Sequence, residues 1–205
     1  MAKAYNSLVH LGGHLLAGVD VETTGTRAGY HEIIQIGIQP LNSDLRPMDD
    51  VRPFYMNMAP KHPERAEREA TVVHGLDLYE LQDTALSAEK VADLLDEWWT
   101  GLDLPFRKTL SPLAHNWAFE CGHLKAWLGE ACAHQFFHSF ARDSMLYAAA
   151  LNDRAAFMGE KQPFNNLRLG SLCKKFGIVN ENPHDALADA RAEGELYRAL
   201  LLFNI

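Results

Sequence analysis

The sequence predicts an α/β fold in which helices flank one mixed five-stranded sheet. Residues 15–58 contain three strand-like segments joined by short connections, as in an antiparallel meander. Strand-like and helical segments then alternate, as expected where further strands join the sheet in parallel. Residues 101–108 and 153–163 look like loops, because neither side of them could form a separate core. We therefore expect residues 1–205 to form a single domain.

Three segments near the N-terminus have the patterns of strands. Residues 15–22 are short and apolar and become β-branched towards their end, which is typical of a buried strand. Residues 32–39 carry isoleucine at alternate positions, with Gln or Gly between them. Residues 51–58 include Pro53, which cannot donate a ladder hydrogen bond, so we expect an edge strand there.

The later segments are predicted from apolar spacing and capping residues. Ser87 precedes apolar residues at helical spacing and has the character of an N-cap. Asn182 and Pro183 are interpreted as the cap and the first-turn proline of the last helix. We predict helices over residues 63–73, 87–100, 119–128, 144–152, 166–176 and 185–203, and strands over residues 109–114 and 135–140.

Composition and charge exclude several classes of protein. A hydrophobic content of 47% and a charged content of 22% are ordinary for a globular chain, which excludes a disordered or fibrous one. The net charge of −8 argues against broad non-specific binding to duplex nucleic acid, which needs many Lys and Arg residues on phosphates. The three cysteines are odd in number and form no CxxC pair, so they indicate free thiols in a reducing compartment.

The hydropathy pattern predicts a cytoplasmic protein without a membrane span. No run of 18 apolar residues occurs. The apolar stretch over residues 8–19 is interrupted by His10, His14 and glycines, and acidic residues follow it directly. We interpret this stretch as the lead into a buried strand and not as a targeting peptide.

Two carboxylates lie at the end of the first predicted strand. Asp20 and Glu22 are two residues apart, so both side chains leave the same face of the strand. Adjacent carboxylates repel each other unless a cation joins them, and oxygen ligands of this kind suit Mg²⁺ or Mn²⁺. Two such carboxylates without other ligands are more often the start of a solvated acidic turn. Further residues are therefore needed to distinguish a metal site from such a turn.

A second group of polar residues lies near the C-terminus. His184 is placed at a predicted helix start, and Asp189 follows in the same segment. Ala186 and Ala190 are small enough to let this helix approach another surface closely. His184 alone would be a capping or surface residue, but beside a bound metal it is well suited to accept a proton from water.

A third group runs from a predicted strand end into a helix. Asn116 could bond to the backbone or to a ligand, and Phe119 offers a flat face for a base or simply belongs to the core. Glu120 lies in the first helical turn, where an acid also stabilises the helix N-terminus. Residue chemistry alone leaves these alternatives open.

The motifs Asp-Val-Glu-Thr-Thr-Gly at 20–25, His-Asn-x-x-Phe-Glu at 115–120 and His-x-Ala-x-x-Asp-Ala at 184–190 occur in this order. Together they resemble the DnaQ-like 3′→5′ exonucleases of the DEDDh type. The segment Val-His-Gly-Leu at 73–76 is similar to the family's His-Gly turn, and the resemblance covers about residues 14–203. It implies an RNase H-like fold, two divalent metal ions and removal of nucleotides from 3′ ends.

The resemblance also implies roles for individual residues. Four acids would hold two Mg²⁺ or Mn²⁺ ions about 4 Å apart, and His184 would act as the general base. The partner would be the 3′ end of single-stranded DNA or RNA, with a polymerase or another replication or repair protein as a candidate partner. The implied metal ligands are Asp20, Glu22, Glu120 and Asp189, and the implied substrate contacts are Thr23, Thr24, His74, Asn116 and Phe119.

One residue departs from the family pattern. Glu120 stands where the family has Asp, which keeps the ligand type but changes its reach. Asp185 and Asp143 are alternative candidates for the fourth ligand. Two other functions stay open: a catalytically weakened module that binds nucleic acid or a partner, and a phosphodiesterase for very short or cyclic nucleotides. The intact His184 favours an enzyme, while the choice between DNA and RNA and the oligomeric state stay undetermined.

Overall fold

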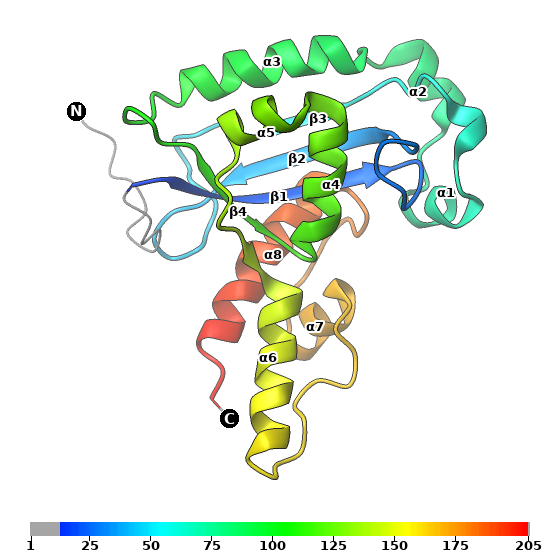
Figure 1. Ribbon diagram of the computed structural model, residues 1–205. Helices are drawn as coiled ribbons and strands as arrows, with labels where there is room; N and C mark the ends of the chain where they lie inside the picture. Colours follow the sequence, from blue (N-terminus) through cyan, green and yellow to red (C-terminus); the bar gives the residue numbers. More distant parts are fainter. Residues whose placement is uncertain (1–12, 205) are drawn as a thin grey trace.

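Within the described residues, five strands form one mixed sheet. The computed structural model describes residues 13–204, so residues 8–12 of the apolar N-terminal stretch lie outside the described residues. The strand order is β3-β2-β1-β4-β5. The first three strands pair antiparallel, and β4 and β5 are parallel to β1, which confirms the predicted fold class (Figure 1). The strands are β1 (Leu15–Thr23), β2 (Ile33–Pro40), β3 (Phe54–Asn57), β4 (Leu110–Ala114) and β5 (Arg142–Asp143).

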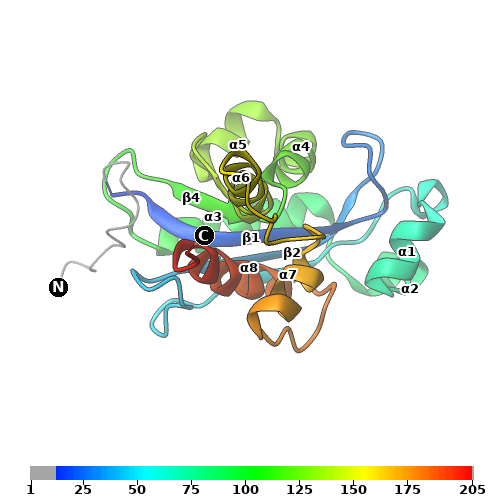
Figure 2. The same cartoon turned by 90° about the horizontal axis from the view of Figure 1, so that it is seen from below.

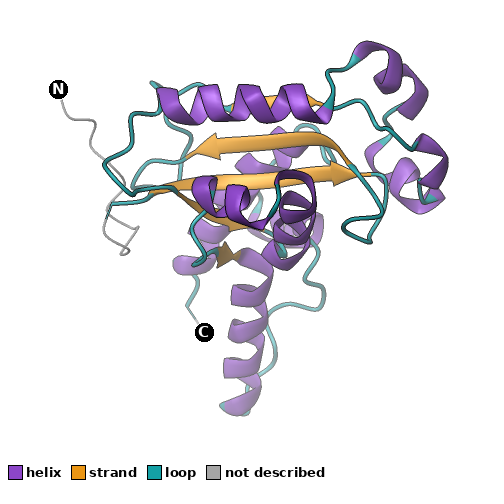
Figure 3. Cartoon of the chain, turned by 45° about the horizontal axis from the view of Figure 1, so that its top comes forward, coloured by secondary structure: helices purple, strands orange, loops and turns teal. Residues whose placement is uncertain are grey.

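Helices cover both faces of this sheet (Figures 2 and 3). Helices α4 and α5 lie on one face, while α7 and α8 lie on the other. Helix α6 extends away from the sheet beside α7 (Figure 1). The helical elements are η1 (Pro63–Arg65), α1 (Arg68–His74), α2 (Leu78–Thr84), α3 (Ala88–Gly101), α4 (Trp117–Leu128), α5 (Glu130–Phe136), α6 (Ser144–Phe157), α7 (Leu169–Phe176) and α8 (Ala186–Leu201).

Alternate side chains of β1 belong to two different apolar clusters, one on each face of the sheet. Val19 and Val21 belong to the largest apolar cluster, together with buried residues of α3, α4 and α5. The intervening residues point to the other face, where Leu16 packs with Leu113 and with Tyr197 of α8. Gly18, Asp20 and Glu22 share the face of Leu16, so both carboxylates are directed to the α8 side of the sheet.

Helix α8 approaches the sheet very closely. A methyl group on Gly18 would lie 2.3 Å from the carbonyl oxygen of Ala190, and one on Gly37 would lie 2.4 Å from the carbonyl carbon of Ala186. Real side chains do not fit at such distances, so glycine on the strands and alanine on the helix are both required here. This contact brings the N-terminal turns of α8 against β1 and β2 beside Asp20.

The predicted strand over residues 135–140 is wrong. Residues up to Phe136 form α5, which begins after Gly129, and Phe137 makes only an isolated bridge with β4. The apolar pair Phe136–Phe137 resembles a buried strand because both rings are buried, but a short apolar run fits either element. The fifth strand is Arg142–Asp143, which is too short and too polar to have a strand signature.

Several predicted helix boundaries are also corrected. The predicted helix over residues 63–73 is divided into η1 and α1, helix α2 was missed, α6 extends to Phe157, and α7 begins only at Leu169. The last helix is capped by Asp185, whose carboxylate accepts a hydrogen bond from the amide of Ala188 at 3.0 Å, and not by Asn182. Pro183 therefore precedes the helix. No helix in the described part of the chain is long and apolar enough to span a membrane.

We expect Gly18→Ala to lower the free energy of unfolding by about 1–3 kcal/mol, the usual cost of overpacking, because the added methyl group meets the backbone of α8. The control is Gly170→Ala in α7, where an added methyl group meets no atom within 4 Å. This control should leave stability unchanged or raise it slightly, since alanine is the better helix former. Urea unfolding of both variants measures the difference, and equal stabilities would contradict the close contact.

Candidate active site

Three polar side chains from β1 and the region around the start of α8 form a compact group. Ligand atoms of Glu22, His184 and Asp189 all lie within 4.8 Å of one another. The Asp189 carboxylate accepts hydrogen bonds from the side-chain amide of Asn180 and, at 3.1 Å, from the backbone amide of His184. His184 is exposed and has a left-handed φ of 67°, a conformation fixed between the preceding loop and the Asp185 cap.

Glu120 lies in the first turn of α4 and is buried, with only 3% of its surface exposed. Its Oε2 has no hydrogen-bond partner among the described residues. Burial raises the pKa of Glu120 well above its usual range, and the charge of Glu120 contributes to raising the pKa of Asp20. Glu120 therefore acts electrostatically on the site, although it does not belong to the compact group of Glu22, His184 and Asp189.

The start of α4 is fixed by a residue from another strand. Asp143, at the end of β5, accepts hydrogen bonds from the backbone amides of Asn116 at 3.3 Å and Trp117 at 2.8 Å. It also caps α6 by accepting from the amide of Leu146 at 3.0 Å. Asn116 consequently has a left-handed φ of 88° just before the helix. The carboxylate of Asp143 is thus engaged in holding two helix starts together.

Asp185, the other acid considered as a fourth ligand, is also engaged. One of its oxygens caps α8 by accepting from Ala188, and the other accepts a hydrogen bond from the Tyr55 hydroxyl. Burial and this hydrogen bond to Asp185 raise the pKa of Tyr55. Neither Asp185 nor Asp143 belongs to the compact group that could hold a metal ion.

A further acid, Glu193, was not predicted from the sequence. It lies one helical turn after Asp189 on α8 and is fully buried. Its Oε1 accepts a hydrogen bond from the amide of His115 at 2.8 Å, and its Oε2 has no partner among the described residues. Burial and the charges of Asp20 and Glu120 raise the pKa of Glu193 well above its usual range. The four-residue spacing from Asp189 was the available signal, since it places both acids on one helix face.

The electrostatics of the site favour a divalent cation. Burial and the neighbouring charges of Asp189 and Asp185 raise the pKa of Glu22 to about 8. Burial and the charges of Glu22, Glu120 and Asp189 raise the pKa of Asp20, and burial raises that of Asp189. No Lys or Arg pairs with these acids among residues 13–204. A set of carboxylate oxygens with one imidazole fits Mg²⁺ or Mn²⁺, and the unpartnered oxygens leave coordination capacity.

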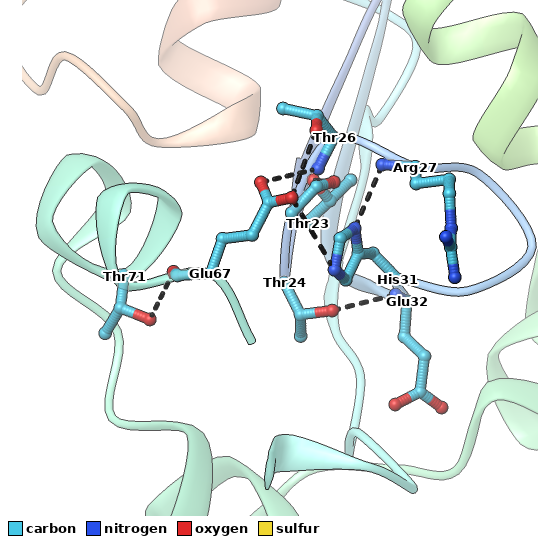
Figure 4. Close-up of polar contacts among 9 residues, drawn as sticks. Thr23, Thr24, Thr26, Arg27, His31, Glu32, Glu67 and Thr71 are labelled. Atoms are coloured by element: carbon cyan, nitrogen blue, oxygen red, sulfur yellow. Dashed lines mark hydrogen bonds and ion pairs between the residues drawn. The ribbon is translucent and has the colours of Figure 1, made fainter. Parts of the chain in front are cut away.

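A cleft of about 260 Å³ opens beside Glu22. Glu67, the residue before α1, connects two walls of this cleft. The carboxylate of Glu67 accepts hydrogen bonds from the backbone amide of Thr26 at 3.0 Å and from the Thr26 hydroxyl at 3.2 Å (Figure 4). The same carboxylate lies 3.8 Å from the imidazole of His31. The backbone amide of Glu67 also donates to Thr24. The cleft lining includes Glu22, Thr23, Glu67, Val73, His74 and Phe119.

His74 lines this cleft and carries a buried ring nitrogen. Its Nδ1 accepts from the amide of Leu76 at 3.0 Å, so in the neutral ring the proton is on Nε2. Burial and the charge of His184 lower the pKa of His74. The Nε2 atom is a buried nitrogen without a hydrogen-bond partner among the described residues.

Of the other predicted substrate contacts, Thr23 and Phe119 line the cleft, while Thr24 and Asn116 do not. Phe119 lines the cleft, and its ring also packs against His123 with centroids 4.4 Å apart. The Thr23 hydroxyl donates to the carbonyl of Gly25 at 2.8 Å. Thr24 is fully buried, and its hydroxyl accepts from the amide of Glu32 at 2.9 Å (Figure 4). Thr24 therefore shapes the turn after β1, while Thr23 and Phe119 form part of the cleft.

Comparison with known proteins identifies the family. Residues 18–197 match the family described as exonuclease (RNase T). The chain belongs to this exonuclease family. Its DnaQ-like, RNase H-like fold agrees with the sheet order and the mixed strand directions described above. No curated protein sequence gives a significant match to the chain.

Solved structures of nucleases share this fold at low sequence identity. Exonuclease I of E. coli, solved in complex with a dT13 oligonucleotide, is 20% identical with a TM-score of 0.69, over 91% of this chain and 41% of that one. The nuclease domain of 3′hExo, a DEDDh family member bound to rAMP, is 16% identical with a TM-score of 0.65, over 96% and 94%. Cell-death related nuclease 4 is 18% identical with a TM-score of 0.66, over 93% and 64%. This chain thus spans about two fifths of the length of exonuclease I.

The raised carboxyl pKa values predict how stability depends on pH without metal. The pKa of Glu22 rises from 4.5 to about 8, so over this interval the folded protein holds a proton that the unfolded chain releases. The free energy of unfolding of the metal-free protein should therefore fall as pH rises from 5 to 8. Thermal melts in EDTA measure this fall, and excess Mn²⁺ should remove most of it.

The variant Glu22→Gln should reduce the slope of the metal-free pH dependence, because it removes one of the acids whose pKa is raised. Glu195→Gln, an exposed position on α8, is the matched control and should keep the parental slope. A metal-free melting temperature that does not change between pH 5 and 8 would contradict the repulsion among these acids.

Proposed function

We propose that residues 14–203 act as one metal-dependent 3′→5′ exonuclease domain on single-stranded DNA or RNA. The observation that carries the proposal is the convergence of acids from β1, α4 and α8 beside an exposed His184, next to a cleft. This cleft of about 260 Å³ would receive the end of a strand, since Glu22 belongs both to its lining and to the group of acids.

The proposed roles of the residues follow from their positions. Asp20, Glu22, Glu120 and Asp189 would hold two Mg²⁺ or Mn²⁺ ions, which when bound stabilise the negative charge that develops at the phosphate. The imidazole of His184 accepts the proton of the attacking water, since it is exposed beside Glu22 and Asp189.

The cleft would hold the terminal nucleotide. His74 and Phe119 both line the cleft, so His74 would contact the terminal nucleotide and the ring of Phe119 would stack on its base. Because Glu67 fixes the turn after β1 to the start of α1, the width of the cleft is set before the nucleotide binds. The terminal nucleotide thus lies close to Glu22, which lines the same cleft.

The deciding experiment digests 5′-labelled and 3′-labelled single strands of DNA and RNA in Mn²⁺. A ladder from 5′-labelled strands, with immediate release of a mononucleotide from 3′-labelled strands, supports the proposal. Binding of the strands without cleavage would favour a weakened binding module. Cleavage of dinucleotides or cyclic nucleotides alone would favour a small-substrate phosphodiesterase.

His184 should control turnover and not substrate binding. We expect His184→Ala to lower kcat roughly a hundredfold to ten-thousandfold, the range usual for a positioned general base. His134→Ala removes an exposed histidine of α5 and is the control, with parental turnover. Single-turnover cleavage of a labelled strand measures both variants. A His184→Ala protein that turns over at the parental rate would leave His184 as a structural residue before α8.

We expect cleavage to require a carboxylate at position 120 on a side chain of the length of glutamate. Glu120→Gln keeps the shape but removes the charge, so cleavage should fall at least about a hundredfold. Glu120→Asp shortens the side chain by up to about 1.5 Å, one C–C bond. Because Asp143 fixes the start of α4, the helix cannot shift to compensate for the shorter side chain. A carboxylate misplaced by about 1 Å lowers the rate on the order of a hundredfold.

Cleavage rates in Mg²⁺ and Mn²⁺ measure these two Glu120 variants. We expect Mn²⁺ to be the better activator for the parent, because Mg²⁺ demands near-ideal octahedral geometry. Faster turnover of Glu120→Asp would mean that the longer side chain is a handicap. Full activity of Glu120→Gln would require another acid in its place.

A further inference from the structure

Glu193 is a buried acid, and packing alone does not explain why this position carries a carboxylate. Its side chain is 0% exposed, and no Lys, Arg or His pairs with it among residues 13–204. Burial of a carboxylate is costly unless the charge is paired and its oxygens are hydrogen-bonded. One oxygen accepts from the His115 amide, while the other has no partner. A glutamine could make the same bond to His115 without placing an acid in the interior.

The surroundings of Glu193 contain two more acids, each from a different element. The charge of Asp20 on β1 and that of Glu120 on α4 both act on Glu193. The close approach of α8 to β1 at Gly18 brings these elements together. Glu120 repeats the feature of Glu193, since its Oε2 is also buried without a partner. Each of these two buried carboxylate oxygens has no partner among the described residues and so has capacity to bind an ion.

We propose that Glu193 is a ligand of a divalent cation held together with Asp20 and Glu120, beside the group formed by Glu22, His184 and Asp189. In this arrangement Oε1 stays on the His115 amide, which orients the carboxylate, and Oε2 binds the ion. The site offers oxygen ligands only, the set that suits Mg²⁺ and Mn²⁺. The inference rests on the proposed two-ion function and adds a fifth acid to the four that the sequence motifs indicate.

The test is a calorimetric titration of the full chain with Mn²⁺ in the absence of nucleic acid. We expect the parent to bind two ions. In Glu193→Gln, which keeps the acceptor for His115, one ion should bind at least about tenfold more weakly, while the other binds as in the parent. Glu195→Gln removes the same charge from the exposed face of α8 and should titrate like the parent.

Thermal melts separate a ligand from a merely structural residue. In EDTA, Glu193→Gln should melt at or above the parental temperature, because it replaces an unpaired buried acid by a neutral amide. The rise in melting temperature on addition of Mn²⁺ should be smaller than in the parent. If Glu193 only positions His115, the rise with Mn²⁺ stays parental, and the proposal is wrong.

A crystal of the unaltered protein soaked in Mn²⁺ makes the test independent of the folding of any variant. An anomalous peak within about 2.0–2.6 Å of a Glu193 oxygen, the range of oxygen ligands, supports the proposal. Two peaks that both lie outside this range overturn it and leave the proposed nuclease function intact. A parent that binds no Mn²⁺ in titration or crystal would overturn the proposed function as well.

Discussion

The close approach of α8 to β1 and β2 determines the rest of the candidate site. Gly18 and Gly37 leave no side chain between the sheet and the helix, and the backbone of α8 occupies that space at Ala186 and Ala190. An ordinary helix–sheet separation would hold the acids of α8 too far from those of β1. Here Asp189 comes within 4.8 Å of Glu22, and Glu193 is buried near Asp20. Packing and chemistry therefore depend on the same four small residues.

This arrangement brings several acids together, and no Lys or Arg among residues 13–204 pairs with them. The raised pKa values of Asp20, Glu22, Glu120 and Glu193 all have burial as their first cause, and neighbouring acids raise each of them further. Without a cation, these acids lower the free energy of unfolding as the pH rises above their pKa values in the unfolded chain. Functional sites commonly violate the rules that the remainder of a fold obeys, and the cost is met by packing elsewhere. In this chain the packing is provided by the large core beneath α3, α4 and α5.

Much of the fold could be predicted because its signals are local. The isoleucine pattern of β2 and the cap at Ser87 depend on neighbouring residues, and both the strand and the cap are found as expected, although every residue of β2 is buried. Strand β5 could not be predicted, since two polar residues become a strand only through pairing with β4. The same applies to the cap on α4, because Asp143 reaches Asn116 and Trp117 across the sheet.

Within the candidate site, the motifs indicate ligand chemistry, and the structure adds spatial relations that no motif contains. The hydrogen bond of Glu193 to His115 joins α8 to the end of β4, and the hydrogen bond of Tyr55 to Asp185 joins β3 to the cap of α8. Neither spacing nor residue type predicts such long-range pairs. The sequence likewise could not distinguish Thr23, which lines the cleft, from its neighbour Thr24, which is buried in the turn.

The double cap by Asp143 links the candidate site to the edge of the sheet. One carboxylate accepts from backbone amides in the first turns of both α4 and α6, and Asp143 itself belongs to β5, the edge strand that pairs with β4. Glu120 lies in the first turn of α4, so its direction depends on this edge strand. A change in β5 would therefore reach the acids of the site through the start of α4 without touching any of them.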